Sequence, residues 1–351
     1  MVGKRKRSKK LKKHANFMPV KFISSKFNSL KEKIISIFSI HKHIPLRTKK
    51  VHFAYGKKEI LRNLNLSVRT SQIIAVVGKS GSGKSTFLNL ISGVLTSNFD
   101  GSISILGHDR LLSKKDIGFV PQEIALIPDL SILENIIFFG SLNGLSKTVA
   151  LTAGKNLLSI LKLNISLTRL PSELSGGQKV RLNILVSLLH NPKMLILDEP
   201  FVGLDYYNRK MLWHFLAYQK NRRRTVIITT HLLVEAEHHS DRLVLLNDGK
   251  IFAKGKLKDI RNKLKIKYVV EVKLDYINKS QFKSLEKYCK DRNIALMDRF
   301  NSYVMFAVHS EGQRNYLFKF IEKLGVGFEE LSFREPNLDE VFLKVGNDEI
   351  K

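Results

Sequence analysis

Residues Gly78-Lys79-Ser80-Gly81-Ser82-Gly83-Lys84-Ser85 form a complete G-x-x-x-x-G-K-[ST] motif in this 351-residue chain. The apolar run 73–77 precedes the motif, and the helix-like segment 86–91 follows it. Glycines let a backbone fold around an anion with its N–H groups pointing inward, and the N-terminus of the next helix adds a positive dipole end. Lys84 would reach the β- and γ-phosphates of a nucleotide, and the Ser85 hydroxyl would bind Mg²⁺. The motif therefore predicts a nucleotide-binding α/β domain.

Two further runs of apolar residues end in groups that suit phosphoryl transfer. The run 195–197 leads directly into Asp198 and Glu199, and His231 follows the strand-like run 226–230. Buried parallel strands read as continuous apolar segments, and ligands of open α/β sheets bind at the carboxyl ends of the strands. Asp198 would hold Mg²⁺ through water, Glu199 would orient or deprotonate the attacking water, and His231 would donate to the γ-phosphate.

The pentapeptide Leu174-Ser175-Gly176-Gly177-Gln178 narrows the assignment. Together with the phosphate loop it resembles the ATP-binding subunits of ABC transporters, and the resemblance extends over about residues 49–260. Five more positions match the motifs of that family in the family's order: Tyr55 for the adenine-stacking aromatic ring, Gln122 for the Q-loop, Asp198-Glu199 for the Walker B strand end, Gly203-Leu204-Asp205 for the D-loop and His231 for the switch histidine.

The resemblance implies an ATPase with ATP and Mg²⁺ as its cofactors. The catalytic residues that it implies are Glu199, His231, Gln122 and Lys84, and the implied metal-site residues are Ser85, Gln122 and Asp198. The implied nucleotide-binding residues are Tyr55, Gly78, Lys79, Ser80, Gly81, Ser82, Gly83, Lys84, Ser85, Thr86, Ser175, Gly176, Gly177, Gln178 and Asp205. Taken alone, a tyrosine, glutamine or histidine at such a position is more often structural; here the order and spacing support all of them together.

The resemblance also implies a dimer. Ser175 and Gly177 would contact the γ-phosphate held by the phosphate loop of a second subunit, so that two nucleotides lie between two head-to-tail subunits. The Leu-Ser-Gly-Gly-Gln segment opens a predicted helix, and a helix N-terminus with a serine and glycines is suited to bind an anion. Whether the second subunit is identical or a paralogue stays open.

The charge of the chain is concentrated at its N-terminus. The chain has 60 Lys+Arg and 31 Asp+Glu, a net charge of +29, and residues 1–50 carry sixteen Lys/Arg and only Glu32 as an acid. Lys4–Lys13 is a basic run, and the segment 19–40 carries apolar residues at alternating three- and four-residue steps. This spacing predicts an amphipathic helix that anchors to an anionic membrane surface. A helix packed on the body of the protein and a nucleic-acid contact are the alternatives.

The composition agrees with a subunit at the cytoplasmic face of a membrane. The single cysteine, Cys289, excludes a disulfide within the chain and suits a reducing compartment. No run approaches the roughly twenty apolar residues of a transmembrane helix. We therefore expect a peripheral protein whose membrane permease is on another chain.

We expect an α/β chain in three parts: a basic extension (1–48), an ATPase domain of mixed sheet and flanking helices (49–262) and a small α+β C-terminal domain (265–351). Residues 123–170 are expected to be helical, within a helical subdomain at about 123–185. Its apolar residues form either a groove that receives the permease or the core of the subdomain. These residues are Ile124, Leu126, Ile127, Ile136, Ile137, Phe138 and Phe139.

The C-terminal part shows a βαββαβ pattern, followed by a capped helix that begins near Pro336. The expected elements are 268–274 (strand), 279–293 (helix), 295–300 and 303–309 (strands), 313–324 (helix) and 327–333 (strand). The final segment 335–343 resembles the close of ATP-binding subunits that serve drug, lipid and polysaccharide exporters, which favours export. The domain itself is either a packing and dimer-stabilising unit or a ligand sensor.

Two other functions compete with transport. A soluble ABC ATPase that acts on ribosomes or nucleic acid is encouraged by the charge of +29. The chain, however, has one contiguous ATPase module, no sustained heptads and no basic motif studded with aromatic residues, so nucleic acid is an unlikely partner. A nucleotide sensor without turnover is disfavoured by the presence of both Glu199 and His231.

Overall fold

The structure is a computed structural model that describes residues 44–264 and 267–348. The expected basic extension and its amphipathic helix at 19–40 lie outside the described residues, apart from the last residues of the extension. Among the described residues, no single helix is long and apolar enough to cross a membrane; two helices pass the test only as a pair bent by 120°.

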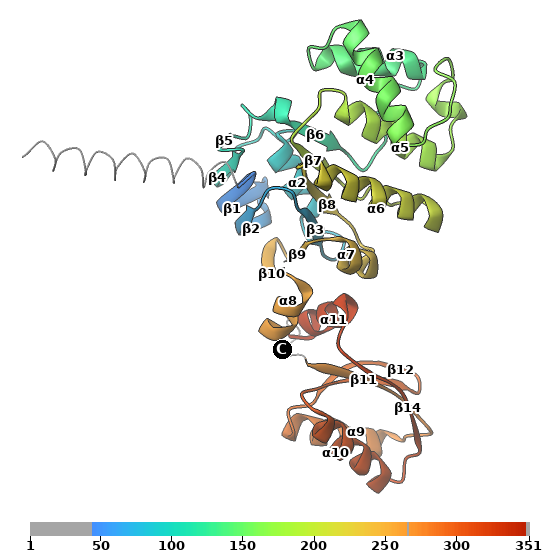
Figure 1. The fold of residues 1–351 in the computed structure, drawn as a ribbon. Helices are drawn as coiled ribbons and strands as arrows, with labels where there is room; N and C mark the ends of the chain where they lie inside the picture. The colour runs from blue at the N-terminus through green and yellow to red at the C-terminus, as the bar shows by residue number, and fades with distance from the viewer. Residues whose placement is uncertain (1–43, 265–266, 349–351) are drawn as a thin grey trace, which may run out of the picture. The chain divides into compact units, whose positions relative to one another are not determined.

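A six-stranded sheet forms the centre of the ATPase part (Figure 1). Its strands are β3 (Ile73–Val77), β6 (Ile117–Val120), β7 (Met194–Leu197), β8 (Thr225–Thr229), β9 (Arg242–Asn247) and β10 (Lys250–Gly255). Their order is β10-β9-β3-β8-β7-β6, with β10 antiparallel to β9 and the other pairings parallel. This is the expected mixed sheet. The strands β3, β7 and β8 are buried along their whole length, which explains their continuous apolar sequences.

Alternate side chains of the central strands enter two separate hydrophobic cores. Ala75 and Val77 face one core, whereas Ile74 and Val76 face a core on the other side of the sheet. The helices α5 (Gly176–Leu188), α6 (Tyr206–Asn221) and α7 (Leu233–His239) contribute to the first core together with further helices, and the second core contains α2 (Lys84–Ser92). The period of two along each strand therefore builds a layered α/β domain.

A four-stranded antiparallel sheet completes the second core. Its strands, in spatial order, are β2 (Lys58–Val68), β1 (Leu46–Tyr55), β4 (Asp100–Ile105) and β5 (His108–Asp109). Leu46 is fully buried and pairs with Val68. The folded part of the chain thus begins inside the segment expected to be extension, ahead of residue 49.

The helical region is shorter than the sequence predicted. Its helices α3 (Ile132–Leu142) and α4 (Lys147–Ile160) are joined by a short turn, and a single 3₁₀ turn (Pro171–Glu173) precedes α5. The prediction of helix throughout 123–170 was wrong for 123–131 and for 161–170. Ser131 and Glu134 form a capping box that fixes the start of α3. The buried Asn135 side chain accepts from the Ile127 N–H and donates to the Ile127 carbonyl, which holds the preceding loop in a non-helical path.

Helices α3 and α4 approach each other closely. A Cβ added at Gly140 would lie 2.4 Å from the Ala150 Cβ, and one added at Gly154 would lie 2.7 Å from the Ile136 side chain. Only glycine leaves room for this contact. The separation of the two helices is therefore set by contact of each glycine with a side chain of the facing helix.

The C-terminal part forms a second antiparallel sheet with its own core. Its elements are β11 (Tyr268–Leu274), α9 (Lys279–Asp291), β12 (Ala295–Phe300), β13 (Tyr303–Val308), α10 (Glu311–Lys323) and β14 (Phe328–Arg334). The strands are arranged in the order β12-β13-β11-β14. Helices α9 and α10 lie on one face of this sheet, as Figure 1 shows, and their buried side chains belong to its core. Two more helices, α8 (Leu257–Leu264) and α11 (Leu338–Asp348), flank this part in the sequence.

Replacing Asn135 with alanine should lower the free energy of unfolding by about 2–4 kcal/mol, because partly buried backbone groups of Ile127 and Leu130 lose the amide side chain that they bond. Urea unfolding followed by circular dichroism would measure the change. The matched control is Asn143→Ala, which removes one exposed hydrogen bond and should cost no more than about 0.5 kcal/mol. Equal effects of the two substitutions would contradict the role assigned to Asn135.

The reactivity of the Cys289 thiol should report the unfolding of the C-terminal sheet. Burial raises its pKa to about 12, whereas a thiol in an unfolded chain has a pKa of about 8.5. The folded chain at pH 8 should therefore resist iodoacetamide, and the denaturant-unfolded chain should react at the rate of a free thiol. Between about pH 8.5 and pH 12 the thiol ionises in the unfolded chain but stays protonated in the folded chain. Raising the pH through this range therefore favours unfolding, and the stabilising contribution of the protonated buried thiol is lost. Rapid labelling of the native chain would contradict the burial.

Candidate active site

The predicted catalytic residues lie at one edge of the central sheet. The phosphate loop follows β3, Gln122 follows β6, and Asp198 and Glu199 follow β7. His231 comes shortly after β8. Because β3, β6, β7 and β8 run parallel, their carboxyl ends meet at the same edge. The sheet topology thus brings the phosphate loop and His231, which are about 150 residues apart in the sequence, to the same edge.

The phosphate loop is shaped by close backbone contacts. A Cβ at Gly78 would lie 2.2 Å from the Leu246 carbonyl oxygen, so only glycine fits there. Gly83 has a φ of 98° and caps the N-terminus of α2. The Lys84 ammonium donates to the carbonyls of Gly78 and Lys79, at 2.9 Å and 3.2 Å. The loop therefore curls around its own lysine.

This loop fits a nucleotide phosphate. The hydroxyl of Ser82 is buried and has no hydrogen-bond partner among the residues that the structure describes. An unpaired buried polar group is costly, and a phosphate oxygen is a suitable acceptor for it. Lys84 supplies the charge, and the first turn of α2, which contains Ser85 and Thr86, supplies free N–H groups.

Glu199 is the centre of the candidate catalytic group. One carboxylate oxygen lies 3.0 Å from His231 Nδ1, and the other lies 3.9 Å from the Lys84 ammonium. Both Lys84 and Glu199 have side chains that are only 10% exposed, whereas the His231 side chain is 61% exposed. A carboxylate held between a histidine and a lysine can accept a proton from water or orient it.

Thr229, which the sequence analysis did not select, forms hydrogen bonds with both Asp198 and Glu199. The Thr229 hydroxyl donates to Asp198 at 2.5 Å and accepts the Glu199 N–H at 2.8 Å. Glu199 has a left-handed backbone, with a φ of 47°, so its conformation depends on such support. In the sequence, Thr229 could have been noticed as a polar residue at the end of the buried strand 225–229.

The oxygen donors suit Mg²⁺. Asp198 is 3% exposed, and Ser85 and Gln122 follow β3 and β6, whose carboxyl ends lie at the same edge of the sheet. Mg²⁺ takes oxygen ligands and is usually bound by one or two carboxylates together with substrate phosphates and waters. In the described part of the chain, no cluster of three or more His, Cys, Asp or Glu could hold a metal without such additional ligands. The donor set thus fits a metal that arrives with a phosphate.

The signature loop is built as the start of a helix. The Ser175 hydroxyl accepts the Gln178 N–H, and the Gln178 side chain accepts the Ser175 N–H, so the two residues form a capping box at α5. The Gln178 side-chain oxygen is thereby committed to the backbone. Gly177 is buried against Asn208, which would be 2.9 Å from an added Cβ. No hydrogen bond or ion pair within residues 44–264 joins this loop to the phosphate loop.

Asp205 begins the neighbouring helix. Its carboxylate accepts hydrogen bonds from the backbone and side chain of Asn208. The bond from the Asn208 N–H is the main cause that lowers the pKa of Asp205. Because Asn208 also packs on Gly177, it links the D-loop to the signature helix, a contact that no sequence motif indicates.

Tyr55 and Gln122 lie on the surface near the ends of their strands. Tyr55 ends β1, is 52% exposed and meets the Phe53 ring edge-on at 4.8 Å between centroids. Gln122 is also exposed. The structure thus joins Lys84, Asp198, Glu199 and His231 through Thr229 and direct contacts, and leaves Tyr55 and Gln122 free to meet a bound molecule.

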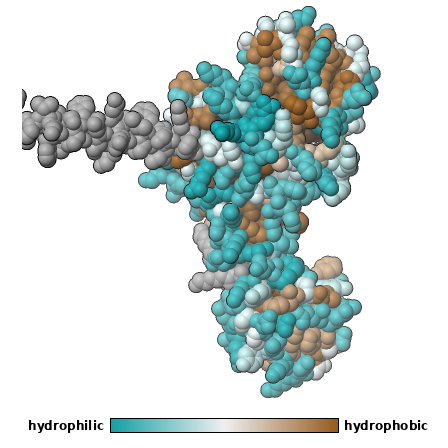
Figure 2. Space-filling model, viewed as in Figure 1, coloured by the Kyte–Doolittle hydropathy of each residue, from teal (hydrophilic) through white to brown (hydrophobic). Residues whose placement is uncertain are grey.

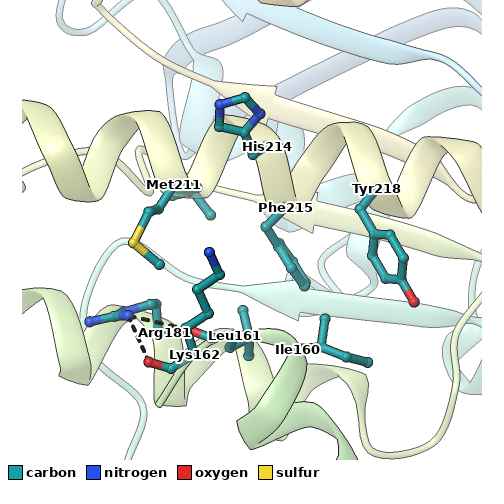
Figure 3. Close-up of a pocket in the computed structure, with 9 residues that line it drawn as sticks. Ile160, Leu161, Lys162, Arg181, Met211, His214, Phe215 and Tyr218 are labelled. Carbon is teal, nitrogen blue, oxygen red and sulfur yellow. Dashed lines mark hydrogen bonds between the residues drawn. The ribbon is translucent and has the colours of Figure 1, made fainter. Parts of the chain in front are cut away.

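A groove of about 460 Å³ lies beside the signature helix, away from the phosphate loop (Figure 3). The Arg181 side chain donates to the carbonyls of Gly177, Leu161 and Lys162, as Figure 3 shows for the latter two. Burial lowers the pKa of Arg181. This arginine fastens the first turn of α5 to the end of α4. The groove is lined by Ile160, Leu161, Lys162, Arg181, Met211, Leu212, His214, Phe215 and Tyr218.

Comparisons with known proteins identify the family of this chain. The family profile described as ABC transporter matches residues 61–202. The linearmycin resistance ATP-binding protein LnrL of Bacillus subtilis is 29% identical over 304 residues, which cover 86% of this chain and 97% of the relative. The Nod factor export ATP-binding protein I of Rhizobium etli is 33% identical over 222 residues, which cover 62% of this chain and 70% of the relative.

Solved structures and longer relatives give the same result. A dimeric structure of a bacterial ABC transporter cassette is 27% identical with a TM-score of 0.55, covering 60% of this chain and 98% of that chain. Some relatives are far longer: this chain spans 21% of ATP-binding cassette sub-family A member 10 of Homo sapiens, at 30% identity. The chain belongs to the family of ABC transporter ATP-binding proteins, and it is an ATPase that binds ATP.

Proposed function

We propose that this chain hydrolyses ATP with Glu199, Lys84 and His231 and that hydrolysis powers export through a permease on another chain. The observation that carries the proposal is the position of the Glu199 carboxylate between His231 and Lys84, beside a phosphate loop. In phosphoryl transfer a protein mainly positions groups and neutralises charge. This arrangement supplies both.

Each residue has a distinct role in the proposal. Lys84 neutralises the β- and γ-phosphates, Glu199 orients or deprotonates the attacking water, and His231 donates to the γ-phosphate. Ser85, Asp198 and Gln122 hold Mg²⁺, which when bound offsets negative charge on the phosphates. Thr229 keeps Asp198 and Glu199 in the geometry that these roles need. Tyr55 stacks on the adenine ring.

The proposal places the signature loop across a dimer interface. Ser175 and Gly177 stand at the start of α5, where backbone N–H groups favour an anion. The similar bacterial cassette was solved as a dimer. We infer that Ser175, Gly176, Gly177 and Asp205 of one subunit complete the nucleotide site of its partner.

The permease is proposed to dock on the surface of α3 and α4. Leu126 and Ile136 are buried in the core, whereas Ile124 and Phe138 are exposed, so only the second pair can serve as contacts. Figure 2 shows hydrophobic surface, in brown, on the part of the molecule that carries α3 and α4. Exposed apolar patches commonly mark protein interfaces. The exposed apolar side chains of these two helices include Phe138, Leu142, Val149 and Ile160.

Export and location are inferred from the similar proteins. Two of them are named for resistance to linearmycin and for export of Nod factor. We propose that this chain serves export at the cytoplasmic face of a membrane, with its basic N-terminal extension on the anionic lipid surface. The proposed domains are the extension, the ATPase domain with its helical subdomain, and the C-terminal α+β domain.

Glu199→Gln should abolish turnover while preserving ATP binding. The amide cannot take a proton from water, so the rate of hydrolysis should fall by about 100-fold or more. The variant should accumulate as an ATP-bound dimer, which size-exclusion chromatography with ATP and Mg²⁺ would detect. Glu173→Gln is the control, because this carboxylate caps a 3₁₀ turn outside the site. Normal hydrolysis by the Glu199 variant would refute its assignment.

Introducing negative charge on the exposed surface of α3 should prevent the chain from binding the permease. The tagged chain, isolated at high salt from detergent-solubilised native membranes, should bring down a protein with several hydrophobic spans. Phe138→Glu with Leu142→Glu should abolish this recovery and leave basal ATP hydrolysis within about twofold, since both side chains are exposed. Tyr276→Glu, at another exposed side chain, should have no effect. Recovery of ribosomal proteins or nucleic acid alone would favour the soluble alternative.

A further inference from the structure

The switch histidine is not held by the packing of its own side chain. The His231 imidazole is 61% exposed, and its contact with Glu199 is a single one of 3.0 Å. Its position therefore depends on the backbone that carries it. That backbone leads within two residues into α7, a helix of only seven residues. Whatever fixes α7 also fixes His231.

One side of α7 is fastened to α6. Glu235 accepts from the Trp213 indole N–H at 2.7 Å and forms an ion pair with Arg209 at 2.8 Å. Both partners lie on the helix that Asp205 caps. This side therefore ties α7 to the segment after the D-loop.

The other side of α7 is fastened to α8 and α11. Glu237 forms an ion pair with Arg261 of α8 at 3.6 Å and accepts the Leu338 N–H at the start of α11 at 3.3 Å. Leu338 and Val341 are fully buried in the same core as Ala236 of α7. Glu237 therefore connects α11, the C-terminal helix, to α7, the helix that follows His231.

Helix α11 is itself fixed at its N-terminus. The Asn337 side chain accepts the Glu340 N–H, and the Glu340 carboxylate accepts the Asn337 N–H, which completes the predicted cap. Glu340 is 2% exposed and binds Arg334, which also binds Glu271 of β11. The hydrogen bonds to Glu340 raise the pKa of Arg334. A buried carboxylate needs such a partner, so the helix start is well determined.

The geometry points to α11 as a brace that positions the catalytic histidine. We propose that Glu237 is a positioning residue for ATP hydrolysis: it joins α11 and α8 to α7 and so holds His231 against Glu199. The inference rests on the role proposed above for His231. It gives the terminal segment 335–343 a function in the ATPase reaction, since Leu338, Glu340 and Val341 fix the helix that Glu237 contacts. Small displacements of a catalytic group lower the rate of the chemical step more than they lower substrate affinity.

The test compares Glu237→Gln with Glu330→Gln in the full chain. Both carboxylates pair with an arginine, but Glu330 pairs with Arg314 of α10 and does not touch α7. Glu237→Gln should lower kcat for ATP about tenfold with KM within twofold, and Glu330→Gln should change neither. Amide hydrogen exchange at 231–236 should become faster in the Glu237 variant, while exchange in β3 and β8 stays unchanged. Arg261→Gln removes the same ion pair from α8 and should act in the same direction.

A double-mutant cycle separates positioning from loss of stability. In single-turnover hydrolysis, Glu237→Gln should have no further effect when His231 is already alanine, because it acts through the imidazole. Full additivity, wild-type kcat in the Glu237 variant, or faster exchange throughout the central sheet would each overturn the brace. If His231→Ala alone hydrolyses ATP normally, the role proposed for His231 fails, and the exchange measurement still decides whether Glu237 fixes the switch segment.

Discussion

The hydrogen bonds of the Thr229 hydroxyl are the contact on which the site depends. They join the end of β8 to the Asp198 carboxylate and to the Glu199 backbone N–H after β7, and they do so through the parallel register that pairs Leu197 with Ile228. A shift of one residue in that register would move the Thr229 hydroxyl to the other face of the sheet, away from both partners. Asp198, Glu199 and His231, the residues proposed for metal binding and catalysis, therefore owe their relative positions to one pair of strands.

Much of this arrangement could be predicted because it is local in the sequence. The phosphate loop, the strand end at Asp198 and the cap at Ser175 each follow from a short run of residues whose backbone geometry has few alternatives. The C-terminal strands were placed nearly residue by residue, since alternation and turn residues mark them. Sequence alone also identified the family, because the motifs occur in a fixed order.

The features that could not be predicted are contacts between distant segments. The Asn135 side chain replaces helical hydrogen bonds in the loop before α3, so the apolar pattern of 123–131 gave the wrong prediction. No sequence motif marks Thr229, Asn208 or Glu237. Their roles follow from contacts with residues that are distant in the sequence. Burial likewise divided the apolar residues of the helical region into core and surface, which periodicity had left together.

The close approach of α3 and α4 has a mechanical consequence. With Gly140 against Ala150 and Gly154 against Ile136, neither helix can slide or roll past the other without its glycine backbone meeting the facing side chain. Both helices share a hydrophobic core with α5, the helix that carries the signature loop. A displacement applied at the exposed Phe138 should therefore move α3 and α4 together as one body against α5.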